Sequence, residues 1–76
     1  MPQPFEYQIT EHIATIGETG GGYTTELNRV AYRDYPPKLD LRKWWNGKPL
    51  KGITLTEEEA RNLYKALAGA LPEEGR

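Results

Sequence analysis

Residues 38–60 decide the fold, and they read KLDLRKWWNGKPLKGITLTEEEA. At the start of this stretch, leucines alternate with polar or charged residues, and a period of two is typical of a strand that is buried on one face. We therefore predict a strand over residues 38–45, with Leu39 and Leu41 on a core face. The opposite, charged face would carry Lys38, Asp40, Arg42 and Trp44.

A turn and a short strand are predicted to follow. Asn46-Gly47 is a strong turn dipeptide, and Pro49 favours a loose connection that lasts until Lys51. Ile53 and Leu55 then mark a short fourth strand.

The clearest local signal is the start of a helix. Thr56 stands three residues before Glu59, which is the spacing of a capping box, and Glu57 and Glu58 suit the positive end of a helix. Apolar residues continue at helical spacing to residue 71, and Pro72 ends the helix. This apolar stripe is too broad for one small sheet to cover. We therefore predict a homodimer whose interface contains Leu63, Tyr64, Leu67 and Leu71.

Two longer extended segments precede the third strand. Phe5, Tyr7 and Ile9 alternate with polar residues, and the later isoleucines break this period, which predicts a bend or bulge near residues 11–12. Gly17 and the glycines at 20–22 predict a hairpin turn. Over residues 23–35 the apolar positions change from odd to even numbers, so we predict a second bulge near Asn28 and an end at the two prolines 36–37. The expected fold is α+β, a single domain of residues 1–76 with the order β-β-β-β-α and an ordered core over residues 5–71.

Charge is distributed in blocks along the chain. Residues 1–26 carry a net charge of −4, residues 27–52 carry +5, and residues 53–76 carry −2. The basic middle block also holds Tyr32, Tyr35, Trp44 and Trp45. Single-stranded nucleic acid offers phosphates to cations and unstacked bases to aromatic rings, so this mixture favours nucleic-acid binding. A basic surface over an aromatic core explains the composition equally well.

The sequence gives little support for an enzyme or for a metal-binding protein. The sequence has no Ser and no Cys to act as a nucleophile, so we expect no enzyme and no catalytic residues. The single His12 has no second His or Cys beside it, which predicts a structural or surface residue, no metal site and no cofactor. No apolar run is long enough for a membrane span and residues 1–5 lack the features of a signal peptide, so we expect no membrane partner and a cytoplasmic location.

The chain resembles a known family over residues 5–71. The motifs that carry the resemblance are Glu26-Leu27-Asn28-Arg29-Val30, Asp40-Leu41-Arg42-Lys43-Trp44-Trp45, and Lys51-Gly52-Ile53-Thr54-Leu55-Thr56, the last of which precedes an acidic helix start. These are similar to the positive cofactor four family of single-stranded-DNA-binding transcriptional coactivators, and especially to its small bacterial YdbC-like members. The resemblance implies a curved antiparallel sheet backed by one helix, and a homodimer that pairs through its helices to form one nucleic-acid-binding channel.

The resemblance also implies roles for individual residues. It places Arg42 on the DNA-facing side of the third strand, makes either Trp44 or Trp45 the residue that stacks on a base, and matches Tyr35 and Lys51 to family positions. The chain departs from the family at residues 36–37, where other members carry a basic or Gly-containing loop. Together with the basic middle block, the predicted nucleic-acid-binding residues are Arg29, Tyr32, Arg33, Tyr35, Lys38, Arg42, Trp44, Trp45, Lys48 and Lys51.

The predicted function is therefore sequence-nonspecific binding of single-stranded DNA by a homodimer, in transcription regulation or related DNA metabolism. Two alternatives remain open. One is an RNA-binding protein, because stacking and phosphate contacts do not read the 2′-hydroxyl. The other is a protein-interaction module, in which the basic face binds an acidic surface, such as one on the transcription machinery.

Overall fold

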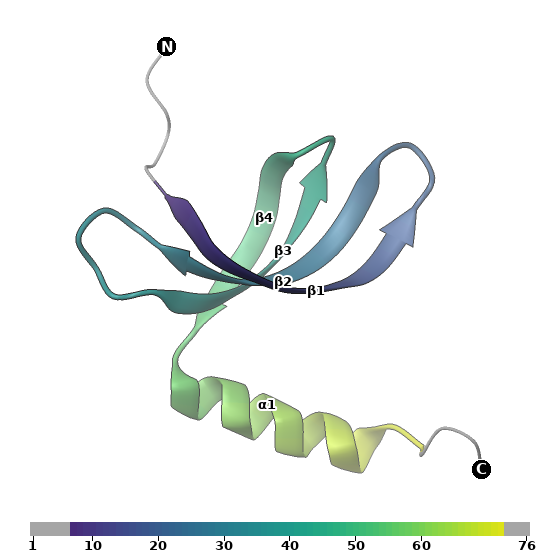
Figure 1. Ribbon diagram of the computed structural model, residues 1–76. Helices are drawn as coiled ribbons and strands as arrows, with labels where there is room; N and C mark the ends of the chain where they lie inside the picture. Colours follow the sequence, from purple (N-terminus) through teal and green to yellow (C-terminus); the bar gives the residue numbers. More distant parts are fainter. Residues whose placement is uncertain (1–6, 73–76) are drawn as a thin grey trace.

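Residues 7–72, which the computed structural model describes, form four antiparallel strands followed by one helix (Figure 1). The elements are β1 (Gln8–Thr19), β2 (Tyr23–Ala31), β3 (Lys38–Trp45), β4 (Lys48–Leu55) and α1 (Glu57–Ala70). The strands lie in the sheet in the order of the sequence, β1-β2-β3-β4. The predicted β-β-β-β-α order and α+β class are confirmed. Phe5, where the first strand was predicted to begin, lies outside the described residues.

β3 spans the predicted residues, whereas β4 is longer than predicted. Asn46 and Gly47 both have positive φ, 48° and 81°, so they form a tight two-residue hairpin and β4 begins at once with Lys48. The prediction of a loose connection at Pro49 is wrong. Pro49 pairs opposite Trp44 on an edge strand, where a residue without an N–H is tolerated.

β1 carries all of the irregularity of the first hairpin. Its register with β2 shifts three times, between Ile9 and Glu11, between His12 and Ala14, and between Thr15 and Gly17. These shifts explain why the isoleucines at 13 and 16 break the period of two. The bulge predicted near Asn28 in the second strand is absent, because β2 pairs with β3 without interruption over residues 23–30.

The bulged sheet is strongly curved, and its buried side chains lie inside the curve. Tyr7 precedes the strand end that pairs with Ala31, and Trp44 pairs with Thr24 at the other end of β2, yet the two rings lie 6.2 Å apart. Val30 and Trp44 are buried on this concave face, as are Asn28 and Asp40. Bulges increase the local twist and bend of a strand, which accounts for the curvature.

The two faces of β3 alternate as predicted, but the assignment of the core to the leucine face is wrong. Asp40 is fully buried and Trp44 is 5% exposed, whereas Leu39 and Leu41 are only half-buried. The reason is the curvature, which encloses the face of Asp40 and Trp44. Leu39 and Leu41 lie on the opposite, convex face, where α1 is the only layer within the described residues (Figure 1).

α1 begins and ends nearly where the sequence predicts. The Glu59 N–H donates to Thr56 Oγ1 at 3.0 Å and the Thr56 N–H donates to Glu59 Oε1 at 2.9 Å, so the capping box is formed. The helix ends at Ala70, one residue before the predicted end. Arg29 Nη1 of β2 donates to Glu57 Oε2 at 3.0 Å and ties the helix to the convex face. No helix in the described part of the chain is long and apolar enough to cross a membrane.

Candidate nucleic-acid interface

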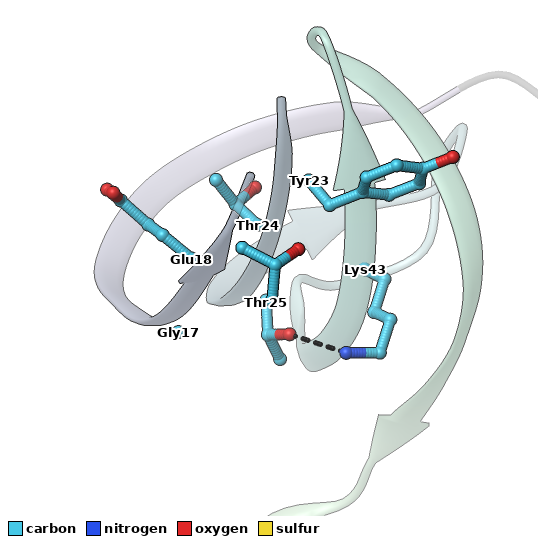
Figure 2. Close-up of a pocket in the computed structure, with 7 residues that line it drawn as sticks. Gly17, Glu18, Tyr23, Thr24, Thr25 and Lys43 are labelled. Carbon is cyan, nitrogen blue, oxygen red and sulfur yellow. Dashed lines mark hydrogen bonds between the residues drawn. The ribbon is translucent and has the colours of Figure 1, made fainter. Parts of the chain in front are cut away.

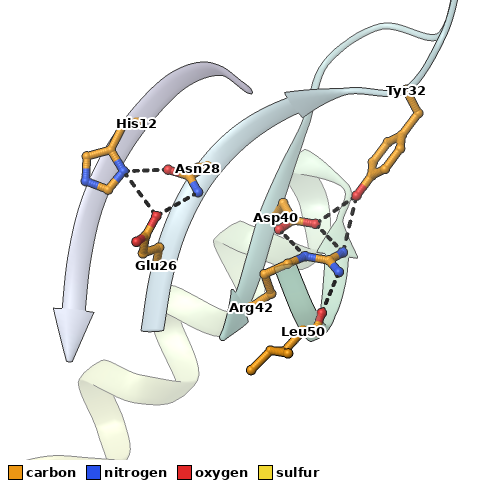
Figure 3. A network of polar contacts seen from close by, with 7 residues as sticks. All are labelled: His12, Glu26, Asn28, Tyr32, Asp40, Arg42 and Leu50. Carbon is orange, nitrogen blue, oxygen red and sulfur yellow. Dashed lines mark hydrogen bonds and ion pairs between the residues drawn. The ribbon is translucent and has the colours of Figure 1, made fainter. Parts of the chain in front are cut away.

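Arg42 lies inside a polar network rather than on an open surface (Figure 3). Its Nε and Nη2 donate to the two carboxylate oxygens of Asp40, each at 2.8 Å, its Nη2 also donates to Tyr32 Oη at 3.2 Å, and its Nη1 donates to the Leu50 carbonyl at 2.8 Å. The Arg42 side chain is 14% exposed. These contacts hold β3 to β4 and to the segment after β2. The predicted phosphate contact of Arg42 stays a prediction, and four of the five N–H groups of the guanidinium donate within this network.

Tyr32 closes the same network. Its hydroxyl donates to Asp40 Oδ2 at 3.1 Å. Burial raises the pKa of Tyr32 above its ordinary 10.0, and the negative charge of Asp40 raises that pKa further. The hydrogen bond to Asp40 raises the pKa of Arg42, which therefore stays charged. The Tyr32 hydroxyl donates to the Asp40 carboxylate and accepts from the Arg42 guanidinium, so Tyr32 has a structural role in the sheet.

The two tryptophans lie on opposite faces of β3, as neighbours in a strand must. Trp44 is on the concave face, buried against Tyr7, and its indole N–H has no hydrogen-bond partner among the described residues. Trp45 is 38% exposed, and its indole N–H donates to the Gly21 carbonyl at 2.9 Å. Of the two stacking candidates, Trp45 alone therefore offers an open ring, and that ring is held in place by the turn between β1 and β2.

A second aromatic ring and two lysines surround Trp45. Tyr23 pairs with Trp45 across β2 and β3, with ring centroids 6.2 Å apart and planes inclined by 36°. Lys48 Nζ lies 5.8 Å from the Trp45 ring centroid, within reach of a cation–π interaction. Lys43, two residues before Trp45 on the same face, is also exposed. We call Tyr23, Lys43, Trp45 and Lys48 the aromatic-basic patch.

The other predicted residues lie elsewhere. Arg29 is held by Glu57 and lies 3.7 Å from Glu11. Arg33, with a positive φ of 55°, and Tyr35 belong to the exposed loop between β2 and β3. That loop and Lys38 lie at the end of β3 opposite Trp45, while Lys51 is exposed on β4. The structure thus brings Trp45 and Lys48 together and leaves Arg33, Tyr35 and Lys38 as a separate group.

Sequence reasoning missed Tyr23 and Lys43. Both enter the patch through the pairing of β2 with β3, which sets Tyr23 opposite Trp45 and Thr25 opposite Lys43. The sequence signal for Tyr23 was its place directly after the glycine turn, at the start of an extended segment. For Lys43, the signal was its position two residues before Trp45, which puts the two on one face of a strand.

A second polar cluster lies on the concave face beside the first (Figure 3). His12 Nδ1 lies 2.6 Å from Asn28 Oδ1, and Asn28 Nδ2 donates to Glu26 Oε1 at 3.4 Å. These contacts agree with the structural role predicted for His12. Within residues 7–72 no group of three or more His, Cys, Asp or Glu side chains is arranged to hold a metal ion.

Comparison with known proteins gives a relative but no function. No family model matches the chain. An uncharacterized protein of Treponema pallidum (strain Nichols) is 35% identical over 57 residues, which cover 72% of this chain and 67% of that protein. The chain belongs to the same family as this protein. Because the relative is itself uncharacterized, family membership assigns no activity to this chain.

Proposed function

We propose that this protein binds single-stranded DNA without sequence preference, through the aromatic-basic patch. The observation that carries the proposal is the exposed Trp45 ring, paired with Tyr23 and flanked by two lysines. Aromatic rings stack on any base because every base has a π-face, and lysines attract the phosphates. This combination favours binding that depends on the backbone and on stacking rather than on base edges.

The geometry favours an unpaired strand over a duplex. Trp45 and Tyr23 project from paired positions of a sheet, so their rings form a continuous surface. A base can lie on that surface only when it is unstacked from its neighbour and unpaired from its partner, which costs a few kcal/mol in a duplex. Single strands do not carry this pairing cost, so they should bind more tightly.

A homodimer would complete the fold. Within the described residues only Val30 and Trp44 are buried apolar side chains, and α1 buries none of its own. Tyr64 is 75% exposed and Leu71 is 62% exposed, and both line a hollow of about 330 Å³ on the helix. The Cα radius of gyration of 14.2 Å exceeds the roughly 11 Å expected for a compact chain of this length. Pairing of two α1 helices would cover the apolar side chains that the sequence predicts as interface.

A protein of this kind would act in transcription regulation or related DNA metabolism, and in the cytoplasm of a bacterial cell. RNA is the second candidate ligand, because nothing in a stacking surface excludes the 2′-hydroxyl. Binding of an acidic protein surface, such as one on the transcription machinery, is the third. Binding of an acidic protein surface does not require an exposed aromatic pair, and for this reason single-stranded DNA or RNA fits the patch better than a protein does.

Fluorescence anisotropy tests the proposal directly. Labelled oligo-dT, a duplex of mixed sequence and an RNA oligomer of matched length are titrated at several salt concentrations. We expect oligo-dT to bind more tightly than the duplex, with log affinity falling against log salt by about 0.7 for every phosphate neutralised. A preference for duplex, or an affinity that salt does not change, would reject the proposal.

A further inference from the structure

Lys43 and Thr25 form a cross-strand pair near the Tyr23 ring (Figure 2). Lys43 Nζ donates to Thr25 Oγ1 at 3.0 Å, and the two residues pair directly across β3 and β2. The next pair on the same face is Trp45 with Tyr23. A cation with a hydroxyl partner therefore stands next to two stacking rings, in one block of four residues from two strands.

A hollow of about 220 Å³ lies beside these pairs, and it is lined by Tyr23, Thr25 and Lys43 and by residues of β1 that include Gly17. It is smaller than the roughly 300–1,000 Å³ of sites that enclose whole drug-sized ligands. A nucleobase with its sugar and phosphate would not fit inside it, whereas a sugar–phosphate unit would. The neighbouring Trp45 ring, outside the hollow, is free to take the base.

We infer that the Lys43–Thr25 pair and this hollow form a phosphodiester subsite, which holds the phosphate adjacent to the base stacked on Trp45. The inference rests on the proposed function and adds a phosphate contact that neither the composition nor the resemblance assigns. Lys43 supplies the positive charge, and Thr25 positions it by accepting its hydrogen bond.

The spacing of the block suits an unstacked strand. Residues 43 and 45 are two positions apart, which is about 6.6 Å along a strand. Stacked nucleotides advance only about 3.4 Å along each strand of a duplex. A base on Trp45 and a phosphate on Lys43 would therefore suit neighbouring nucleotides of an extended backbone, as in a single strand.

Glu18 limits the charge that the hollow accepts. It contributes to the lining, although Figure 2 shows its carboxylate directed away from Lys43. A phosphodiester carries one negative charge, while a terminal phosphate carries close to two at neutral pH. The nearby carboxylate opposes the second charge, so the subsite takes an internal phosphodiester in preference to a strand end.

Three variants of the full chain test the subsite by anisotropy with oligo-dT over a series of salt concentrations. Lys43→Gln removes the charge, Thr25→Val removes the hydroxyl but keeps the shape, and Lys65→Gln removes an exposed charge from α1 as a matched control. We expect Lys43→Gln to weaken binding about two- to fivefold, the range typical of an exposed ion pair. It should also make the salt slope shallower by about 0.7, the contribution of one phosphate. Thr25→Val should weaken binding without changing the slope, and Lys65→Gln should change neither quantity.

The outcomes separate the subsite from the proposed function. If the parent protein binds oligo-dT and Lys43→Gln behaves like Lys65→Gln, the subsite is wrong and single-strand binding stands. If the parent protein does not bind oligo-dT at all, the proposed function fails and takes the subsite with it. A 5′-phosphorylated oligo-dT that binds more tightly than its unphosphorylated counterpart would overturn the preference for an internal phosphodiester.

Discussion

Arg42 holds both carboxylate oxygens of Asp40 through two hydrogen bonds of 2.8 Å, and Asp40 is completely buried. A buried carboxylate is stable as an ion only when charged and polar partners surround it, and here the guanidinium and the Tyr32 hydroxyl do so. The pair therefore links two strands and the segment after β2 at the centre of the concave face. The same arginine that the resemblance assigns to DNA is a structural residue of the sheet in this chain.

Arg42→Ala should destabilise the fold by about 3–5 kcal/mol, because it leaves the buried Asp40 carboxylate without its charged partner. The free energy of unfolding, measured by urea titration, checks this value. Lys38→Ala is the matched control, since Lys38 is an exposed cation on the same face of the same strand. If Arg42→Ala leaves the unfolding free energy unchanged and only weakens DNA binding, the structural role is wrong and the predicted phosphate contact gains support.

The two tryptophans should respond to substitution in different ways. Trp44→Ala should cost about 3–5 kcal/mol of stability, because Trp44 fills the concave core. Trp45→Ala should leave the fold intact and weaken single-strand binding by about 1–3 kcal/mol, the contribution of one stacked base. Urea unfolding and anisotropy, performed on both variants, separate the two effects.

Fluorescence gives an independent measurement of the same contrast. Trp44→Phe keeps an aromatic ring and removes a buried N–H that has no partner in the described chain, so this variant should fold. It leaves Trp45 as the single indole, whose emission a stacked base should quench. If saturating oligo-dT does not change that emission, stacking on Trp45 is wrong.

The sequence predicts the features that depend on neighbouring residues better than the features that depend on contacts between distant residues. The helix and the third strand follow from residues that are neighbours in the chain, such as Thr56 with Glu59, and both were predicted within one residue. Pairing of Tyr23 with Trp45 depends instead on the register across the loop of residues 32–37, which no turn dipeptide specifies. The aromatic-basic patch therefore could not be predicted from the sequence, because it depends on how β2 pairs with β3.

The error about the core has a similar cause. Alternation along β3 correctly separates Leu39 and Leu41 from Asp40 and Trp44, but alternation cannot tell which face is concave. Bulges in β1 bend the sheet toward the polar face and bury it, and β1 is two strands away from β3. A polar network of Asp40 and Arg42 then takes the place that aliphatic side chains occupy in most small cores.

Gly52→Ala should strongly destabilise the sheet. A Cβ at this position would collide with the Arg42 side chain and with the Leu41 carbonyl, so neighbouring backbone would have to move. Gly69 is the matched control, because it lies in α1 with nothing within 4 Å of its added Cβ. There the change to Ala should stabilise the protein by about 0.5–1 kcal/mol. Thermal unfolding of both variants measures the two shifts, and equal shifts for the two variants would contradict the close approach at Gly52.

Stability should decline at high pH because of Tyr32. Its pKa is higher in the folded chain than the ordinary 10.0, so its stabilising contribution is complete below pH 10 and is lost as pH rises through the folded pKa. Tyr32→Phe lacks this titration and also loses the hydrogen bonds, so it should be less stable than the parent at pH 8. Above pH 10, the free energy of unfolding of the parent should fall toward that of Tyr32→Phe. Urea unfolding between pH 8 and pH 11 provides the measurement. Two curves that stay parallel over this range would show that Tyr32 does not titrate with folding.

Leu67→Lys should convert the proposed dimer into a monomer. Leu67 is partly exposed on α1 and lies beside Leu71 and Tyr64 in the apolar hollow of that helix. A monomer would tolerate a lysine at this position, because its charge could reach water. In a helix–helix interface the same charge would be buried without a partner, at a cost of about 3–5 kcal/mol.

Leu50→Lys is the matched control, since Leu50 is similarly exposed but lies on β4. Light scattering at micromolar concentration should therefore give twice the chain mass for the parent and for Leu50→Lys, and the chain mass for Leu67→Lys. A parent protein that scatters as a monomer would exclude the dimer, and the apolar side of α1 would then need another explanation.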